Sequence, residues 1–123
     1  MDHRIIEIKN IDELEQKKQE ENLVIVDFWA PWCGPCKRMD SIFQEIVQEE
    51  TGFVICKVSI DNHHDFAAQN RIISIPTFIM FHKGDELEKR MGSMDKATFA
   101  QWIKEVKHSI NGSQPRVQPS VQP

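Results

Sequence analysis

The sequence of 123 residues predicts an α/β fold in which helices cover both faces of a central mixed β-sheet. Three near-continuous apolar runs, at 22–29, 53–60 and 75–82, are typical of strands that are buried on both sides. The turn residues at 83–85 return a short strand at 88–91 antiparallel, which makes the sheet mixed. The main elements follow the order βαβαβββα, with two crossovers.

The first helix begins after the alternating residues Ile6 and Ile8. Asn10 is a good N-cap, because its side chain can accept a hydrogen bond from a backbone N–H that lacks a helical partner. Glu13 occupies the reciprocal capping-box position. Lysines 17 and 18 lie near the end of the helix, where positive charge is favourable.

The second helix begins near Pro35, a suitable first-turn residue because its missing N–H would be unpaired there. The expected buried stripe recurs at helical spacing and comprises Cys36, Met39, Ile42, Phe43, Ile46 and Val47. A short helix at 64–70 precedes the third apolar run. Asp95 caps the last helix, whose apolar face comprises Phe99, Trp102, Ile103 and Val106.

The domain is expected to span residues 1–109. From about Ile110 the composition becomes rich in Pro, Gln and Ser, so we expect residues 110–123 to form a disordered tail; a partner-binding tail is the alternative.

Composition and charge narrow the class of partners. The formal net charge of −4 argues against nucleic acid or an anionic membrane as the main partner. No run reaches the roughly 18 apolar residues of a membrane span. The N-terminus lacks the apolar stretch of a secretory signal, which predicts a cytoplasmic protein unless a signal has been removed. In that compartment a close cysteine pair is more often catalytic or metal-binding than structural.

Cys33 and Cys36 form such a pair at the start of the second helix. Side chains three positions apart on a helix share a face, so a disulfide can form. The unpaired N–H groups of the helix end favour negative charge on Cys33, and Lys37 and Arg38 reinforce this. Cys36 is the more protected partner.

This placement predicts a dithiol–disulfide cycle. The Cys33 thiolate attacks a substrate disulfide, and Cys36 then resolves the mixed disulfide. Cys36 needs a base, and Asp27, an acid within the first apolar run, is the candidate because desolvation raises its pKa. The positive charge of Lys57 is expected to temper the rise in the pKa of Asp27. The alternatives are a structural buried acid at Asp27 and a snorkelling lysine at Lys57.

The chain resembles the thioredoxin family over roughly residues 5 to 108. The resemblance is carried by Trp32-Cys33-Gly34-Pro35-Cys36, by the segments VDFWA, KVSID and IPTF, by the turn at Gly84, and by Gly92 before the last helix. It implies a thioredoxin fold in which Pro76 is cis and lies across from the cysteines.

The resemblance also implies how substrates bind. Ile75 would pair with an extended substrate segment through its backbone. Trp32, Gly34, Pro35, Ile75 and Gly92 would form a shallow apolar docking surface. A flavoprotein thioredoxin reductase using NADPH would supply electrons, so this chain would bind no cofactor itself. The Gly-Pro pair between the cysteines resembles that of the reducing members, and we expect a monomer.

Two residues depart from the family pattern. Ser41 stands where thioredoxins commonly place a helix-kinking proline, so we expect a straighter helix. Cys56 is an additional thiol, interpreted as a small core residue with a regulatory thiol as the alternative. A zinc half-site would need further ligands, for which the candidates are Cys56, His63, His64 and His82, but Cys56 and His63 fit no finger spacing.

The sequence therefore predicts a thiol–disulfide oxidoreductase that reduces protein disulfides. Two alternatives stay open. One is a binding subunit with this fold that stabilises a partner complex without turnover. The other is a specialised disulfide oxidant or isomerase.

Overall fold

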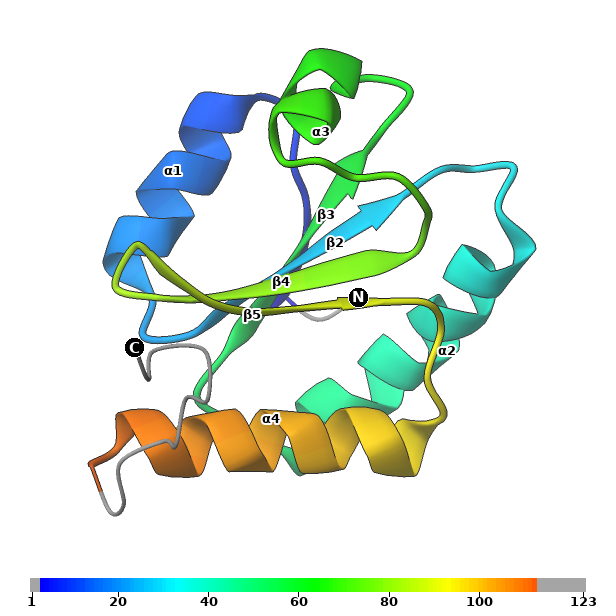
Figure 1. The fold of residues 1–123 in the computed structure, drawn as a ribbon. Coiled ribbons are helices and arrows are strands. Elements are labelled where there is room, and N and C mark those ends of the chain that lie inside the picture. The colour runs from blue at the N-terminus through cyan, green and yellow to red at the C-terminus, as the bar shows by residue number, and fades with distance from the viewer. Residues whose placement is uncertain (1–2, 113–123) are drawn as a thin grey trace, which may run out of the picture.

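The computed structural model describes residues 3–112. These residues form five strands and four helices: β1 (Ile5–Glu7), α1 (Ile11–Glu20), β2 (Val24–Trp29), α2 (Gly34–Glu49), β3 (Val54–Ser59), α3 (His64–Gln69), β4 (Thr77–His82), β5 (Asp85–Met91) and α4 (Lys96–Ile110) (Figure 1). The predicted α/β class is confirmed. The tail predicted at 110–123 begins within the described residues, where Ile110 is the last residue of α4 and residues 111–112 form a turn; the rest of it, from 113 onward, lies outside the described residues.

The sheet has the strand order β1-β3-β2-β4-β5. β1, β3 and β2 run parallel to one another, whereas β4 pairs antiparallel with β2 and β5 pairs antiparallel with β4. The sheet is therefore mixed, as predicted, and β2 lies at its centre. The chain leaves β2 directly into α2, so the start of that helix lies at the carboxyl end of the central strand.

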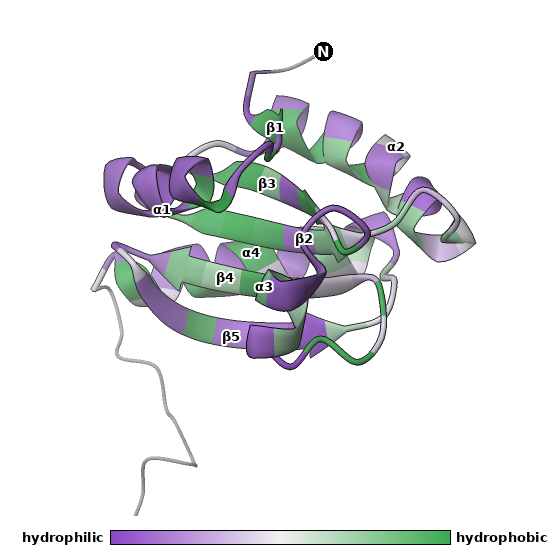
Figure 2. Cartoon of the chain, turned by 90° about the horizontal axis from the view of Figure 1, so that it is seen from above, coloured by the Kyte–Doolittle hydropathy of each residue, from purple (hydrophilic) through white to green (hydrophobic). Residues whose placement is uncertain are grey.

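Helices cover both faces of this sheet (Figure 1). On one face α2 and α4 pack over a core whose fully buried members include Ile25, Phe43, Ile55, Phe78, Phe99 and Trp102. On the other face α1 and α3 contribute Leu14 and Ala67 to a second core with the alternate residues of the strands, Val26, Phe28, Cys56 and Ile79 among them. Figure 2 shows the resulting contrast, with apolar central strands and a largely hydrophilic α1 and β5.

The caps predicted for the first and last helices are present. The side chain of Asn10 accepts a hydrogen bond from the Glu13 N–H at 3.0 Å, and Asp95 accepts one from the Thr98 N–H at 2.8 Å. One detail differs from the capping box. The Glu13 carboxylate accepts from the N–H of Lys9 at 3.0 Å, so it satisfies a donor one residue before the cap.

The strand predicted at 88–91 is longer than expected, because β5 begins at Asp85. Lys83 and Gly84 both have positive φ angles, of 51° and 88°, which is the backbone of a tight hairpin turn. β5 is an edge strand whose first residues are charged and exposed. An apolar pattern therefore cannot reveal where it begins.

The second helix is continuous through Ser41. Its buried residues are Cys36, Met39, Phe43, Ile46 and Val47, as predicted, whereas Ile42 is only partly buried at the margin of the core. Whether α2 is straighter than its proline-containing counterparts stays a prediction. Within residues 3–112, no helix combines the length and the apolar character that crossing a bilayer requires.

Candidate active site

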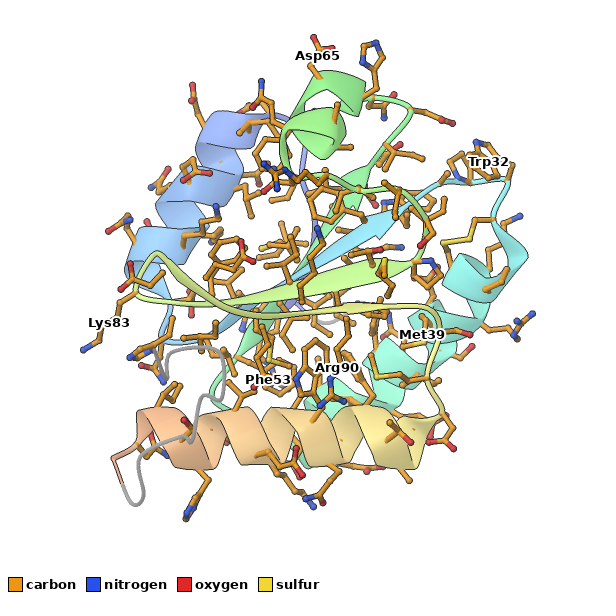
Figure 3. The ribbon with its side chains drawn as sticks, in the orientation of Figure 1. Trp32, Met39, Phe53, Asp65, Lys83 and Arg90 are labelled. Carbon is orange, nitrogen blue, oxygen red and sulfur yellow. A yellow bond between two sulfur atoms is a disulfide. The ribbon has the colours of Figure 1, made fainter. Side chains whose placement is uncertain are left out.

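Cys33 and Cys36 form a disulfide at the N-terminus of α2, with their Cα atoms 5.3 Å apart. Cys33 is the N-cap residue, and its Sγ atom accepts a hydrogen bond from the Cys36 N–H at 3.2 Å. Both residues are largely buried, with 5% and 2% of their surfaces exposed. Figure 3 shows the disulfide at the same end of the molecule as Trp32.

The charge around this helix end favours an anionic sulfur. The first turn of α2 contains no acidic residue, and Lys37 and Arg38 follow directly after Cys36. The N–H groups at the start of a helix and its macrodipole both stabilise negative charge. Cys33 occupies the cap position, where these effects are strongest.

A second segment approaches the disulfide from the loop before β4. The Ile75–Pro76 peptide bond is cis, which confirms the geometry that the resemblance implied. The Sγ atom of Cys33 lies 3.9 Å from the carbonyl oxygen of Ile75. Ile75 and Trp29 pack against the small cluster formed by Ala30 and the two cysteines.

Gly92 joins the site through the backbone. Its N–H donates a hydrogen bond of 2.8 Å to the carbonyl of Pro76, and its φ of 95° is one that side chains rarely adopt. Gly34 has no such backbone requirement. A Cβ atom at either glycine would meet no other atom within 4 Å, so the space above both residues is open. The glycines therefore leave room for another molecule to approach the disulfide.

Exposed apolar side chains lie near the site residues in the sequence. Among the residues described, the large hydrophobic side chains that are exposed are Trp32 at 66%, Ile73 at 83% and Met91 at 59%. Trp32 directly precedes Cys33, Ile73 lies two residues before Ile75, and Met91 directly precedes Gly92. The indole of Trp32 is oriented by Asp61, whose carboxylate accepts its N–H at 3.2 and 3.3 Å.

Asp27 lies on β2, two residues before Trp29, which packs against the cysteine cluster, and it is completely buried. Within the described part of the chain, neither of its carboxylate oxygens has a hydrogen-bond partner. Burial therefore raises the pKa of Asp27 to about 8, against the lowering influence of Lys57, while Asp40 and Glu7 raise it further. A carboxyl with such a pKa can accept and release a proton near neutral pH.

Lys57 stands opposite Asp27 in the register of β2 and β3. Its ammonium group, however, makes an ion pair of 2.7 Å with Asp40 on α2. It also lies 4.4 Å from the centre of the Trp29 ring. The charge of Lys57 lowers the pKa of Asp27, but the direct partner of its ammonium group is Asp40, and the predicted role of Lys57 in tempering Asp27 stays a prediction.

A comparison with protein families decides what this arrangement is. The family model described as Thioredoxin matches residues 6–105. The chain belongs to the thioredoxin family. It is 38% identical over 99 residues to a thioredoxin of Mycoplasma pneumoniae, a match that covers 80% of this chain and 97% of that protein.

Solved structures and a fused relative agree with this assignment. A structure of Plasmodium falciparum thioredoxin is 30% identical, with a TM-score of 0.75 over 81% of this chain and 97% of that one. A bifunctional thioredoxin reductase/thioredoxin of Mycobacterium leprae is 34% identical over 89 residues, which are 72% of this chain and 19% of that protein. The thioredoxin relatives and the Cys33–Cys36 pair make this chain a thiol–disulfide oxidoreductase, a protein-disulfide reductase.

The thioredoxin-like site includes residues that the sequence reasoning did not select. Asp40 and Glu7 surround Lys57, and Ile73 and Met91 are exposed apolar residues close to site residues in the sequence. Asp40 lies four positions after Cys36, and such spacing places both on one face of the helix, so this signal was available. Among the described residues, no group of three or more His, Cys, Asp or Glu side chains has the arrangement of a metal site.

Proposed function

We propose that this chain reduces disulfides in proteins through a Cys33/Cys36 dithiol–disulfide cycle, and that a thioredoxin reductase restores the dithiol. The observation that carries the proposal is the disulfide itself. It closes at the N-cap of α2, beside the cis-proline loop, and Trp32, the residue before Cys33, is exposed.

In the first step, the thiolate of reduced Cys33 attacks one sulfur of the substrate disulfide. The substrate S–S bond breaks, one substrate sulfur leaves as a thiolate, and a mixed disulfide forms between Cys33 and the other sulfur. The Cys36 N–H, which lies 3.2 Å from the Cys33 sulfur, and the positive helix end support an anionic sulfur there.

In the second step, Cys36 transfers its proton to Asp27, and the resulting thiolate attacks the Cys33 sulfur. The mixed disulfide breaks, the second substrate sulfur leaves as a thiolate, and the Cys33–Cys36 disulfide forms. Two electrons have then moved from the dithiol to the substrate. The pKa of Asp27, raised by burial to about 8, supports its proposed role as the proton acceptor.

The proposed docking surface surrounds the disulfide and comprises Trp32, Gly34, Pro35, Ile75, Pro76 and Gly92. The open space above Gly34 and Gly92 admits a substrate chain. The backbone of Ile75, next to the Cys33 sulfur, would pair with an extended segment of the substrate. Trp32 supplies an exposed apolar contact.

The electron donor is proposed from the relatives. The fused protein of Mycobacterium leprae carries both names, thioredoxin reductase and thioredoxin, in one chain. We assign NADPH and flavin to a separate reductase and no bound cofactor to this chain. We propose that the protein is a monomer, that it lies in the cytoplasm, and that it carries electrons from the reductase to its substrates. The small number of exposed large apolar side chains among the described residues supports the monomer.

The test is NADPH consumption with insulin as the disulfide substrate and a bacterial thioredoxin reductase. We expect turnover that disappears in Cys33→Ser and persists in Cys56→Ser, a control in which the buried third thiol is replaced. Cys36→Ser should accumulate a mixed disulfide with insulin. If several reductases fail while dithiothreitol drives insulin reduction through the chain, the reductase part of the proposal is wrong. If dithiothreitol also fails, the reduction cycle is wrong.

A further inference from the structure

Three charged residues form a row across the sheet under α2. Glu7 on β1 stands opposite Lys57 on β3, which in turn stands opposite Asp27 on β2. Each follows, two positions later, a residue of the core beneath α2 and α4, namely Ile5, Ile55 and Ile25. Side chains two apart on a strand share a face, so all three charged residues point toward the α2 side.

The central member of the row is Lys57, whose side chain is only 13% exposed. Two acids of the row are its neighbours in register, but its ammonium pairs with Asp40, 2.7 Å away on α2. The Trp29 ring lies 4.4 Å from the same ammonium and donates its own N–H to Glu7 at 3.2 Å. Asp40 and Trp29 therefore hold the ammonium on the helix side of the row.

This arrangement leaves Asp27 without a direct partner. Its two oxygens have no hydrogen bond within residues 3–112, although the residue opposite carries three N–H donors. A largely buried ammonium is stabilised by an ion pair with a carboxylate. If the carboxylate of Asp40 is removed, that of Asp27 can pair with the Lys57 ammonium instead. The ion pair of Lys57 with Asp40 is thus in competition with an ion pair of Lys57 with Asp27.

We propose that Asp40 is a positioning residue for the exchange reaction, because its carboxylate holds the Lys57 ammonium on α2 and keeps it from pairing with the buried carboxyl of Asp27. This inference rests on the proposed role of Asp27 as the base for Cys36. Asp40 touches neither the cysteines nor the substrate in this scheme, and it acts through Lys57.

A pocket of about 160 Å³ gives solvent access to this ion pair. It lies between β1, β3 and α2 and is lined by Ile5, Glu7, Asp40, Phe43, Gln44 and Lys57. The side chain of Asp40 is 44% exposed. The pocket thus exposes the Lys57–Asp40 ion pair to solvent, whereas Asp27, on the neighbouring strand β2, is completely buried.

The charges that act on Asp27 come from three elements. Lys57 on β3 lowers its pKa, whereas Asp40 on α2 and Glu7 on β1 raise it. β4 places the apolar residue Phe78 opposite Asp27. Glu7 itself is exposed at the end of β1, and its pKa is raised chiefly through desolvation, while Lys57, the hydrogen bond from Trp29 and His63 lower it and Asp40 raises it.

The loss of the Asp40 charge lowers the pKa of Asp27 in two ways. It removes one negative charge near Asp27, and it frees the ammonium of Lys57 to approach Asp27. Both effects favour the ionised carboxyl. The conservative change Asp40→Glu keeps the charge and the capacity to pair, so it should restore the original behaviour.

The experiment titrates the Asp27 carboxyl by carbon-13 NMR in the oxidised protein, where Cys33 and Cys36 do not ionise. In Asp40→Asn the midpoint should fall by about one pH unit or more. Asp40→Glu should return it toward the original value. Glu45→Gln removes the same charge from the same helix, but Glu45 pairs with Lys96, so this control should leave the midpoint unchanged. An unmoved midpoint in Asp40→Asn, or an equal shift in Glu45→Gln, overturns the inference.

A double-variant cycle separates positioning from the direct charge effect. In the Lys57→Met background, Asp40→Asn should produce a much smaller fall of the Asp27 midpoint. An undiminished fall would show that Asp40 acts on Asp27 without Lys57, and would overturn the positioning role.

Single-turnover rates then separate this inference from the proposed function. In Asp40→Asn the midpoint of the pH profile for mixed-disulfide resolution should move down together with the carboxyl titration. If the titration midpoint of Asp27 moves while the midpoint of the rate profile does not, Asp27 is not the base. That result would still support the inference that Asp40 positions Lys57.

Discussion

Asp27 and Lys57 stand directly opposite each other on β2 and β3, yet the Lys57 ammonium pairs with Asp40 and the Asp27 carboxyl has no hydrogen bond within the described chain. The two residues are neighbours in the register of the sheet, but Asp40 on α2 competes with Asp27 for the Lys57 ammonium. Desolvation of the buried carboxyl raises the pKa of Asp27 to about 8, and Lys57, whose ammonium pairs with Asp40, does not offset that rise.

The raised pKa predicts that the oxidised protein loses stability as pH rises from about 4 to about 8. Unfolded Asp27 ionises near its ordinary value of 3.8, whereas the folded carboxyl keeps its proton to about 8. Between these values the folded state binds more protons, so the free energy of unfolding falls with pH. The total loss is on the order of 5 kcal/mol.

Asp27→Asn cannot ionise, so its stability should fall much less over the same range, and it should exceed that of the original protein at pH 9. Denaturant unfolding of both oxidised proteins at pH 5, 7 and 9 measures this. If the free energy of unfolding changes with pH to the same extent in both proteins, the assignment of a raised pKa to Asp27 is contradicted.

Trp32→Ala should affect reduction without affecting folding. Trp32 is 66% exposed and its indole contacts the exposed Asp61, so its removal should change the free energy of unfolding by less than about 0.5 kcal/mol. The loss of an apolar contact at the docking surface should lower kcat/KM for insulin by about tenfold.

Trp102→Phe provides the contrast for that variant. Trp102 is 1% exposed and donates to Glu88 at 2.7 Å, so its replacement should lower stability while reduction persists. Equal effects of the two variants on insulin reduction would argue against a docking role for Trp32.

Cys56 should be unreactive in the native protein. It is fully buried on β3, and burial raises the pKa of its thiol to about 12, so the thiol stays protonated at pH 8. Iodoacetamide should therefore modify no cysteine of the native oxidised protein and one cysteine after unfolding in guanidinium chloride, as counted by mass spectrometry. Rapid native labelling of Cys56 would favour the regulatory thiol instead.

Asn10→Ala should destabilise the protein by about 1 kcal/mol, because it removes the acceptor for the Glu13 N–H at the start of α1. Asn10→Ser retains a capping oxygen and serves as the matched control. Thermal unfolding of the three proteins compares them. A loss in the serine variant as large as that in the alanine variant would show that the cap is not the cause.

The central strands were predictable because they are covered on both sides. β2, β3 and β4 read as apolar runs, and the single charges within β2 and β3, Asp27 and Lys57, stood out against them. The cysteine pair and its helix end were predictable from local spacing. β5 was found only in part, because an edge strand with charged residues carries no apolar signal at its start.

The ion-pair partner of Lys57 could not be predicted from the sequence. The pairing of Lys57 with Asp40 depends on how α2 lies across β3, a relationship between segments that no local pattern encodes. Likewise, Gly92 comes next to Pro76 only because the end of β5 pairs with the start of β4. Such positions follow from tertiary packing.

The two edge strands bear on how the protein avoids pairing with itself. β1 has only three residues, and β5 presents exposed Asp85, Glu86 and Lys89 along the opposite edge. Short or charged edges discourage the strand-to-strand association that leads to aggregation. The short β1 edge and the charged β5 edge therefore disfavour strand pairing between copies of the protein, and the proposed backbone pairing with substrate falls instead to the loop at Ile75, beside the Cys33 sulfur.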